Sequence, residues 1–143
     1  MAIKQLTVFV PNQKGAIVSL TQVLSKNLIN MRALSIAETA EFGILRLIVD
    51  DEVKAKTVLE KEGYLIKIVD VVGVKIGDEV GKLSLALGVL DKSDINVEYL
   101  YAFMTRTEKH AYVVLRVENN DLAQNALTNA GFKLITQADI DKL

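Results

Sequence analysis

The chain has 143 residues, half of them apolar and 24% charged, so it is expected to fold as one ordinary domain or two very small ones. Its 17 basic and 18 acidic residues nearly balance, and no run of like charge is long enough to follow a phosphate backbone, which argues against nucleic acid as a partner. The sequence contains no cysteine, which excludes disulfides, thiolate metal sites and cysteine nucleophiles.

Export and membrane insertion are not indicated. The first residues alternate between polar and apolar, unlike the basic and then apolar segments of a secretory signal. The longest apolar tracts, such as 83–90, are far shorter than the about 20 residues that cross a bilayer. We therefore expect a cytoplasmic protein with no membrane partner.

The first half of the chain is predicted to alternate strands and helices. A strand over 3–10 has apolar residues at every second position and ends at a loop that contains proline. Apolar residues then recur at the spacing of one helical face: Ile17, Leu20, Leu24 and Leu28. Strands over 29–38 and 43–49 follow, joined by a short hairpin. A second helix ends at Gly63, and a fourth strand is expected over 64–72.

The second half repeats this order. A strand ends near Ile76 and is followed by a helix with an apolar face made of Leu83, Ala86, Leu87 and Leu90. Strands over 95–104 and 111–117 come next. The last helix has its own apolar face, formed by Leu122, Ala123, Ala126 and Leu127, and a final strand starts at Phe132.

The similarity of the two halves extends to individual residues. The interval from Gly15 to Gly81 equals the interval from Asn30 to Asn96, and the later segments match at a slightly longer interval. The chain therefore consists of two units, 1–70 and 71–143. No stretch rich in proline or serine separates them, so we expect the units to pack in a fixed way.

Each unit has the order βαββαβ, which predicts an α+β fold of the ferredoxin-like type: an antiparallel four-stranded sheet with both helices on one face. Strands alternating with single helices would also suit a doubly wound parallel sheet. The hairpin without a helix in the middle of each unit argues against that alternative.

Residues suited to chemistry are few. His110 is the only histidine, lies in an expected hairpin and has no second imidazole nearby in sequence, so neither a metal site nor a Ser-His-Asp triad is expected. Three carboxylates at 50–52 are explained by the start of a helix. No phosphate-binding loop is present. We therefore expect no catalytic residue, no metal and no cofactor, and we do not expect an enzyme.

Several short segments recur in register with the repeat: residues 8–17, 23–24 and 28–31, and then 81–83, 89–90 and 95–97. Together they resemble the ACT domain, a small amino-acid-sensing module attached to many biosynthetic enzymes. The resemblance covers the whole chain as a tandem pair. It implies that the units lie side by side by pairing their second strands, in one continuous antiparallel eight-stranded sheet with four helices on one face.

The resemblance also implies a ligand site at the seam, between the loop before the first helix of one unit and the second strand of the other. A helix N-terminus favours a carboxylate, and glycine lets a ligand approach the backbone. The candidate ligand-binding residues are Asn12, Lys14, Gly15, Ala16, Ile17 and Ile36 in the first unit, and Asp78, Val80, Gly81, Lys82, Leu83, Tyr99 and Tyr101 in the second.

Two features of the second unit have alternative interpretations. The acidic pair 78–79 either binds the ammonium group of a ligand or is a solvated part of the loop. Tyr99, Tyr101 and Phe103 share one face of the second strand, where the first unit has Ala33, Ser35 and Ala37. These aromatic rings either shape a pocket at the seam or cover the sheet or an oligomer contact.

The resemblance implies a regulatory protein that binds a free amino acid, aliphatic or similar to histidine, and acts on amino-acid metabolism through a partner, such as a biosynthetic enzyme. The alternative is a constitutive regulatory subunit similar to that of acetolactate synthase. The helix-free face of the first sheet carries Phe9, Ile44 and Ile48, and we expect it to support a homodimer.

Overall fold

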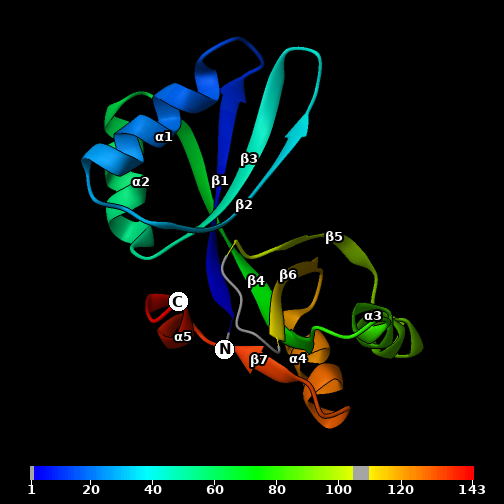
Figure 1. Ribbon diagram of the computed structural model, residues 1–143. Coiled ribbons are helices and arrows are strands. Elements are labelled where there is room, and N and C mark those ends of the chain that lie inside the picture. The colour runs from blue at the N-terminus through cyan, green and yellow to red at the C-terminus, as the bar shows by residue number, and fades with distance from the viewer. Residues whose placement is uncertain (1, 105–109) are drawn as a thin grey trace. The chain divides into compact units, whose positions relative to one another are not determined.

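The computed structural model describes residues 2–104 and 110–143, and Figure 1 shows the order of the elements. The hairpin expected at 105–109 lies outside the described residues. Contacts divide the chain into two compact units, which we call the first-repeat unit, Lys4–Val69, and the second-repeat unit, Asp70–Leu143, to which the start of the chain up to Ile3 is joined.

The first-repeat unit has the expected order of elements. They are β1 (Ile3–Pro11), α1 (Ala16–Lys26), β2 (Met31–Glu38), β3 (Phe42–Val49), α2 (Glu52–Lys61) and the first half of β4 (Leu65–Gly77). The strand order is β2-β3-β1-β4, and β3 is antiparallel to both β1 and β2. This is the ferredoxin-like order, and β2 is its edge strand.

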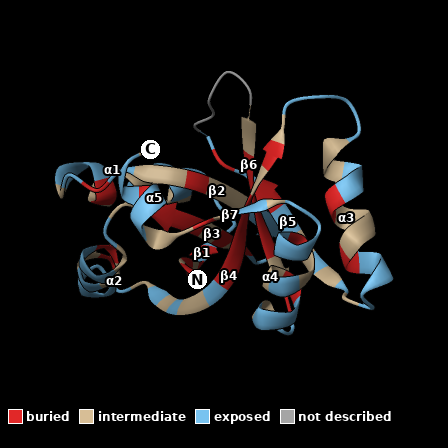
Figure 2. Ribbon diagram, turned by 90° about the horizontal axis from the view of Figure 1, so that it is seen from below, coloured by how far each residue is buried: buried red, intermediate tan, exposed pale blue. Residues whose placement is uncertain are grey.

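Both helices of this unit pack on the same face of the sheet. Leu20 and Leu24 of α1, with Ala55 and Leu59 of α2, form one core with alternate strand residues: Leu6, Val8, Val10, Leu45, Leu47 and Val49. Each fully buried leucine contributes about 1.5–3 kcal/mol through removal of its side chain from water. Figure 2 shows buried residues along the strands and exposed outer faces on the helices.

The second-repeat unit has the same arrangement. It contains the rest of β4, then α3 (Lys82–Lys92), β5 (Val97–Ala102), β6 (His110–Val117), α4 (Asn120–Asn129), β7 (Lys133–Ile135) and α5 (Gln137–Asp141). The strand order is β5-β6-β4-β7, so β5 is an edge strand. Ala86 and Leu90 of α3 and Ala123 and Leu127 of α4 share one core with the strands.

The described residues form seven strands and five helices, where the sequence predicted eight and four. The strand expected over 64–72 and the one ending near Ile76 are a single strand, β4, because β-branched residues continue on both sides of Asp70 and Gly73 and no proline separates them. The additional helix, α5, is only 5 residues long, too short for a helical apolar period to reveal it in the sequence.

The helix-free face of the first sheet is less exposed than the sequence suggested. Ile48 is completely buried in the chain, so it offers no surface to a second copy. Phe9 remains 43% exposed, and its ring meets that of Phe42 edge-on at a centroid distance of 6.4 Å. The apolar surface that remains here is therefore this aromatic pair, together with the half-buried Ile44, which is the register partner of Phe9.

The capping box of α5 should make the stability of the chain depend on pH. The Thr136 backbone N–H donates to the Asp139 carboxylate at 2.9 Å, and this hydrogen bond lowers the pKa of Asp139 below its ordinary value of 3.8. A lowered pKa in the folded state stabilises the protein above the unfolded-state pKa, and this contribution is lost as the pH falls through the folded-state value. Asp139→Asn should therefore reduce the free energy of unfolding at neutral pH and make no difference in strong acid.

Urea unfolding of the natural chain and of Asp139→Asn, from neutral pH to strong acid, measures the difference in the free energy of unfolding. A difference that stays constant as the pH falls would show that the carboxylate charge is not its source.

Candidate functional site

The loop between β1 and α1 is fastened to the β2–β3 turn. The Asn12 backbone N–H donates to the Glu41 carbonyl at 3.0 Å, and the Asn12 side-chain amide donates to the Thr39 carbonyl at 3.0 Å. Gly15 then turns the chain into α1 with a φ of +85°, a left-handed conformation that favours glycine. Asn12, a candidate from the sequence, therefore positions the loop.

The helices that follow the two candidate loops begin differently from α2 and α4. Gly15 and Gly81 are the N-cap residues of α1 and α3, and neither helix has a side-chain hydrogen bond at its cap. In α2 and α4 the side chains of Asp51 and Asn119 accept from first-turn amides. First-turn amides without a side-chain acceptor carry the positive end of the helix dipole and favour an anion.

A cavity of about 320 Å³ lies beside the first loop, a volume near the lower end of the range for small-molecule sites. It is lined by Val10, Pro11, Asn12, Gln13, Ile17, Ile36, Glu38 and Gly43. The fold thus brings together three of the sequence candidates, Asn12, Ile17 and Ile36. The other candidates of this unit lie between lining residues 13 and 17: Lys14 and Gly15 in the turn, and Ala16 as the first residue of α1.

Sequence reasoning missed five residues of this cavity: Val10, Pro11 and Gln13, which are next to the loop candidates in the chain, and Glu38 and Gly43, which lie on other strands. Glu38 and Gly43 are register partners in β2 and β3, and Gly43 also pairs with Val10 of β1. A Cβ atom on Gly43 would lie 3.1 Å from Cδ1 of Ile36, so glycine lets that side chain lie across the strand. A glycine at the start of an otherwise apolar strand was the available signal, since a glycine in a strand can mark a close approach of another segment.

The second loop is arranged differently, because the Lys82 side chain lies over the end of β4. A Cβ atom on Gly77 would lie 3.3 Å from Cγ of Lys82, and the Lys82 ammonium group is 3.9 Å from the Glu79 carboxylate. Lys82 also lines a groove of about 440 Å³ between α3 and the turn before β7.

The remaining candidates of the second loop are distributed. Asp78 and Val80 are exposed, Gly81 has a φ of +88°, and Leu83 packs against the core of its own unit. Leu83 therefore has a structural role, whether or not it also contacts a ligand.

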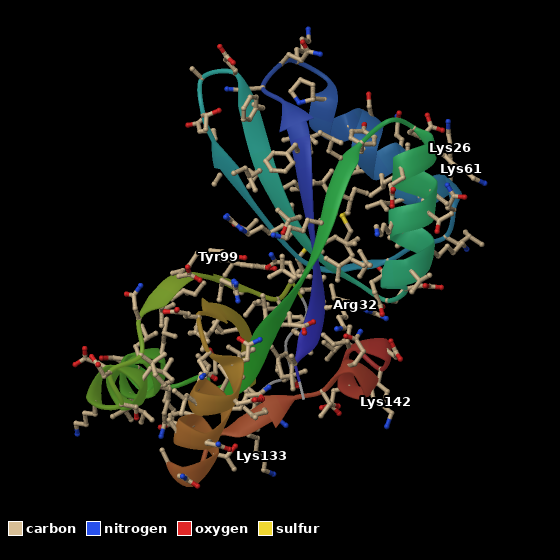
Figure 3. All side chains as sticks on the ribbon, turned by 180° about the vertical axis from the view of Figure 1, so that it is seen from behind. Lys26, Arg32, Lys61, Tyr99, Lys133 and Lys142 are labelled. Carbon is tan, nitrogen blue, oxygen red and sulfur yellow. The ribbon has the colours of Figure 1, made fainter. Side chains whose placement is uncertain are left out.

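The aromatic residues of β5 pack against one another. The rings of Tyr99 and Tyr101 are stacked with centroids 6.4 Å apart, and Phe103 meets Tyr112 edge-on at 6.2 Å. Tyr101 is only 8% exposed, whereas Tyr99, labelled on β5 in Figure 3, is half-buried. Tyr101 therefore belongs largely to the packing of the chain, and Tyr99 has more surface left for a ligand.

Two further properties concern the residues that the structure describes, 2–104 and 110–143. None of their helices is long and apolar enough to cross a membrane. No group of three histidine, aspartate or glutamate side chains among them is arranged to hold a metal ion.

The family model of the ACT domain pair matches residues 1–143. The chain belongs to the ACT domain pair family. This confirms the resemblance found in the sequence, and it assigns the chain to a type of module that regulates rather than catalyses. No curated protein matches the chain.

Solved structures agree with this assignment. A protein from Bacteroides thetaiotaomicron has 38% identity and a TM-score of 0.93, with 100% of this chain and 98% of that one covered. The regulatory subunit of aspartate kinase from Thermus thermophilus has 17% identity and a TM-score of 0.66, with 90% and 91% covered. Aspartate kinase from Synechocystis has 18% identity and a TM-score of 0.61, with 95% of this chain but 28% of that one covered. At this identity the two kinase structures show a shared fold alone.

The two loop glycines of this ACT domain pair should each be required by backbone conformation. A Cβ atom on Gly15 or Gly81 would meet no atom within 4 Å, so the cost of a side chain there comes from the positive φ alone. Gly15→Ala and Gly81→Ala should each lower the free energy of unfolding by about 1–2 kcal/mol.

Gly88 in the middle of α3 is the matched control, since it has equally open space and an ordinary helical φ. Gly88→Ala should raise stability by about 1 kcal/mol, because alanine is the better helix former. Urea unfolding of the three variants measures the contrast, and equal effects at all three positions would contradict it.

Proposed function

We propose that this ACT domain pair is a sensor that binds a free amino acid and regulates amino-acid metabolism through a partner enzyme. The ligand lies at a seam between an ACT unit within 1–70 and one within 71–143. The loop before the first helix of one unit holds it on one side, and the second strand of the other unit holds it on the opposite side.

The observation that carries this proposal is the cavity beside the first loop together with the uncapped start of α1. An amino acid presents a carboxylate, an ammonium group and a side chain, and each has a suitable counterpart here. First-turn amides of α1 suit the carboxylate. Glu38 suits the ammonium group, and Ile17 and Ile36 suit an apolar side chain.

A homodimer is part of the proposal. β2 pairs with β3 and β5 pairs with β6, and these two strands end the strand order β2-β3-β1-β4-β6-β5. The expectation that they pair with each other within the chain is therefore wrong for the described strands. An unpaired strand edge is a template for a further strand, and a second copy of the chain offers one. Pairing through the second strands would build the seam from two chains.

Regulation would then follow from linkage. A ligand that binds one packing of the seam more tightly than another shifts the equilibrium toward that packing by its differential affinity. A partner enzyme that recognises only one of the two packings would then be regulated by the ligand, because the ligand changes the population of that packing.

The alternative is a constitutive regulatory subunit, similar to that of acetolactate synthase, whose main role is to hold a catalytic chain. The similarity in fold to an aspartate kinase regulatory subunit favours an enzyme as the partner in either case. The two roles differ in copurification: a constitutive subunit brings its enzyme along with or without the ligand.

A thermal-shift screen against the twenty amino acids and a nucleotide panel tests the sensor. A ligand that binds only the folded state at a hundred times its Kd adds about 2.7 kcal/mol, which raises Tm by several degrees. We expect one amino acid or a small chemically related group to produce such a shift. No shift with any amino acid would contradict the sensor and favour the constitutive subunit.

The dimer is tested by light scattering on a size-exclusion column. We expect a mass of twice 15.7 kDa that persists on dilution into the micromolar range. A mass of one chain at high concentration would contradict the dimer without bearing on ligand binding by a single unit.

A further inference from the structure

Each repeat contains a loop before its first helix and the neighbouring ends of its second and third strands. The two units can therefore be compared position by position within one chain. Ile36 pairs with Leu45 in β3, and its counterpart Ala102 in the second repeat pairs with Val113 in β6. The strand registers therefore match, and residues at equal offsets hold equal places in the two units.

The floor and wall of the cavity differ between the repeats. In the first-repeat unit the floor is Gly43, opposite Val10, and Ile36 lies across it. In the second-repeat unit the place of Gly43 is taken by Ala111, opposite Ile76, and the place of Ile36 by Ala102. The second version thus has a side chain on the floor and a much smaller wall residue.

The charge differs as well. Glu38 is the charged residue among those lining the first cavity, and the remaining lining is apolar or amide-bearing. Met104 takes the place of Glu38 in the second repeat and carries no charge. A carboxylate beside apolar walls selects a ligand that combines an ammonium group with an apolar body.

The first position of the helix differs most in size. In α1 it is Ala16, whose side chain is a single methyl group. In α3 it is Lys82, whose stem lies 3.3–3.5 Å from the place of a Cβ atom on Gly77 and whose ammonium group pairs with Glu79. The second loop is therefore spanned by its own lysine, which a ligand would have to displace.

From these differences we infer that each chain binds one amino acid, at the cavity of the first-repeat unit, and that the site selects an aliphatic amino acid whose ammonium group is held by Glu38. The inference rests on the proposed function and narrows it to a single site and ligand class. The apolar walls that the first-repeat unit supplies, Ile17 and Ile36, favour a leucine-like side chain over histidine.

Isothermal titration calorimetry of the full chain tests this with L-leucine, L-histidine and isocaproic acid, which has the carbon skeleton of leucine without the ammonium group. We expect one leucine per chain, at least tenfold weaker binding of histidine, and no measurable binding of isocaproic acid. Glu38→Gln should weaken leucine binding about ten- to a hundredfold, because it removes a charge-assisted hydrogen bond.

Met104→Gln is the matched control at the equivalent place of the second repeat, and it should leave leucine affinity unchanged. Ala16→Lys should weaken leucine binding, because it places a long side chain at the start of α1 beside the cavity. Circular dichroism verifies the fold of each variant. Because residue 38 is exposed on an edge strand, the comparison of Glu38→Gln with Met104→Gln stands even if Ala16→Lys fails to fold.

The results distinguish failure of the single aliphatic site from failure of the amino-acid sensor on which it rests. Two leucines per chain, or full affinity in Glu38→Gln, would overturn the single site while leaving an amino-acid sensor. Binding of another class of amino acid in place of leucine would overturn the aliphatic preference in the same way. Failure of all twenty amino acids to bind would overturn the sensor itself.

Discussion

Burial of one apolar face of each four-stranded sheet under two helices is the constraint on which the other features depend. Leu24 and Leu90 occupy equivalent buried places in α1 and α3, and both helices must lie back across the strands that precede them. The chain therefore has to reverse direction within a few residues. Gly15 and Gly81 permit that reversal through a left-handed conformation, and neither leaves a side chain to cap the helix.

The position of the candidate site follows from the same reversal. The uncapped start of α1 lies where β1 ends, so its first-turn amides stand beside the ends of β2 and β3. Glu38 and Gly43 are register partners at those ends. Carboxylate, amides and an apolar hollow are therefore brought together by the packing of a small α+β unit, and the loop itself contributes few polar side chains.

Duplication of the unit permits specialisation without loss of fold. The core positions of the two repeats remain apolar, whereas the positions around the loop differ in size and charge. The pair of Lys82 with Glu79 at the start of α3 contributes at most about 1 kcal/mol, because Glu79 is exposed and Lys82 is only partly buried. One repeat can thus keep an open cavity while the other has its loop covered, with the same strand order in both.

The sequence by itself determined the repeat, the ferredoxin-like order of each unit, the ACT resemblance and the two loop glycines. Periodicity shows which residues share a face of a helix or strand, and spacing shows where a pattern returns. Neither shows which strands become neighbours.

Only the tertiary structure decided that β4 is continuous, that Ile48 and Tyr101 are buried, and that Glu38 and Gly43 border the cavity. These depend on contacts between segments far apart in the chain. Val10 and Gly43 are distant in sequence, separated by a helix and a strand, and become neighbours only through the register of β1 and β3. The cavity depends on that register, because its floor is Gly43, which has no side chain. The absent side chain creates space only because Ile36 and Val10 are its neighbours in the folded chain.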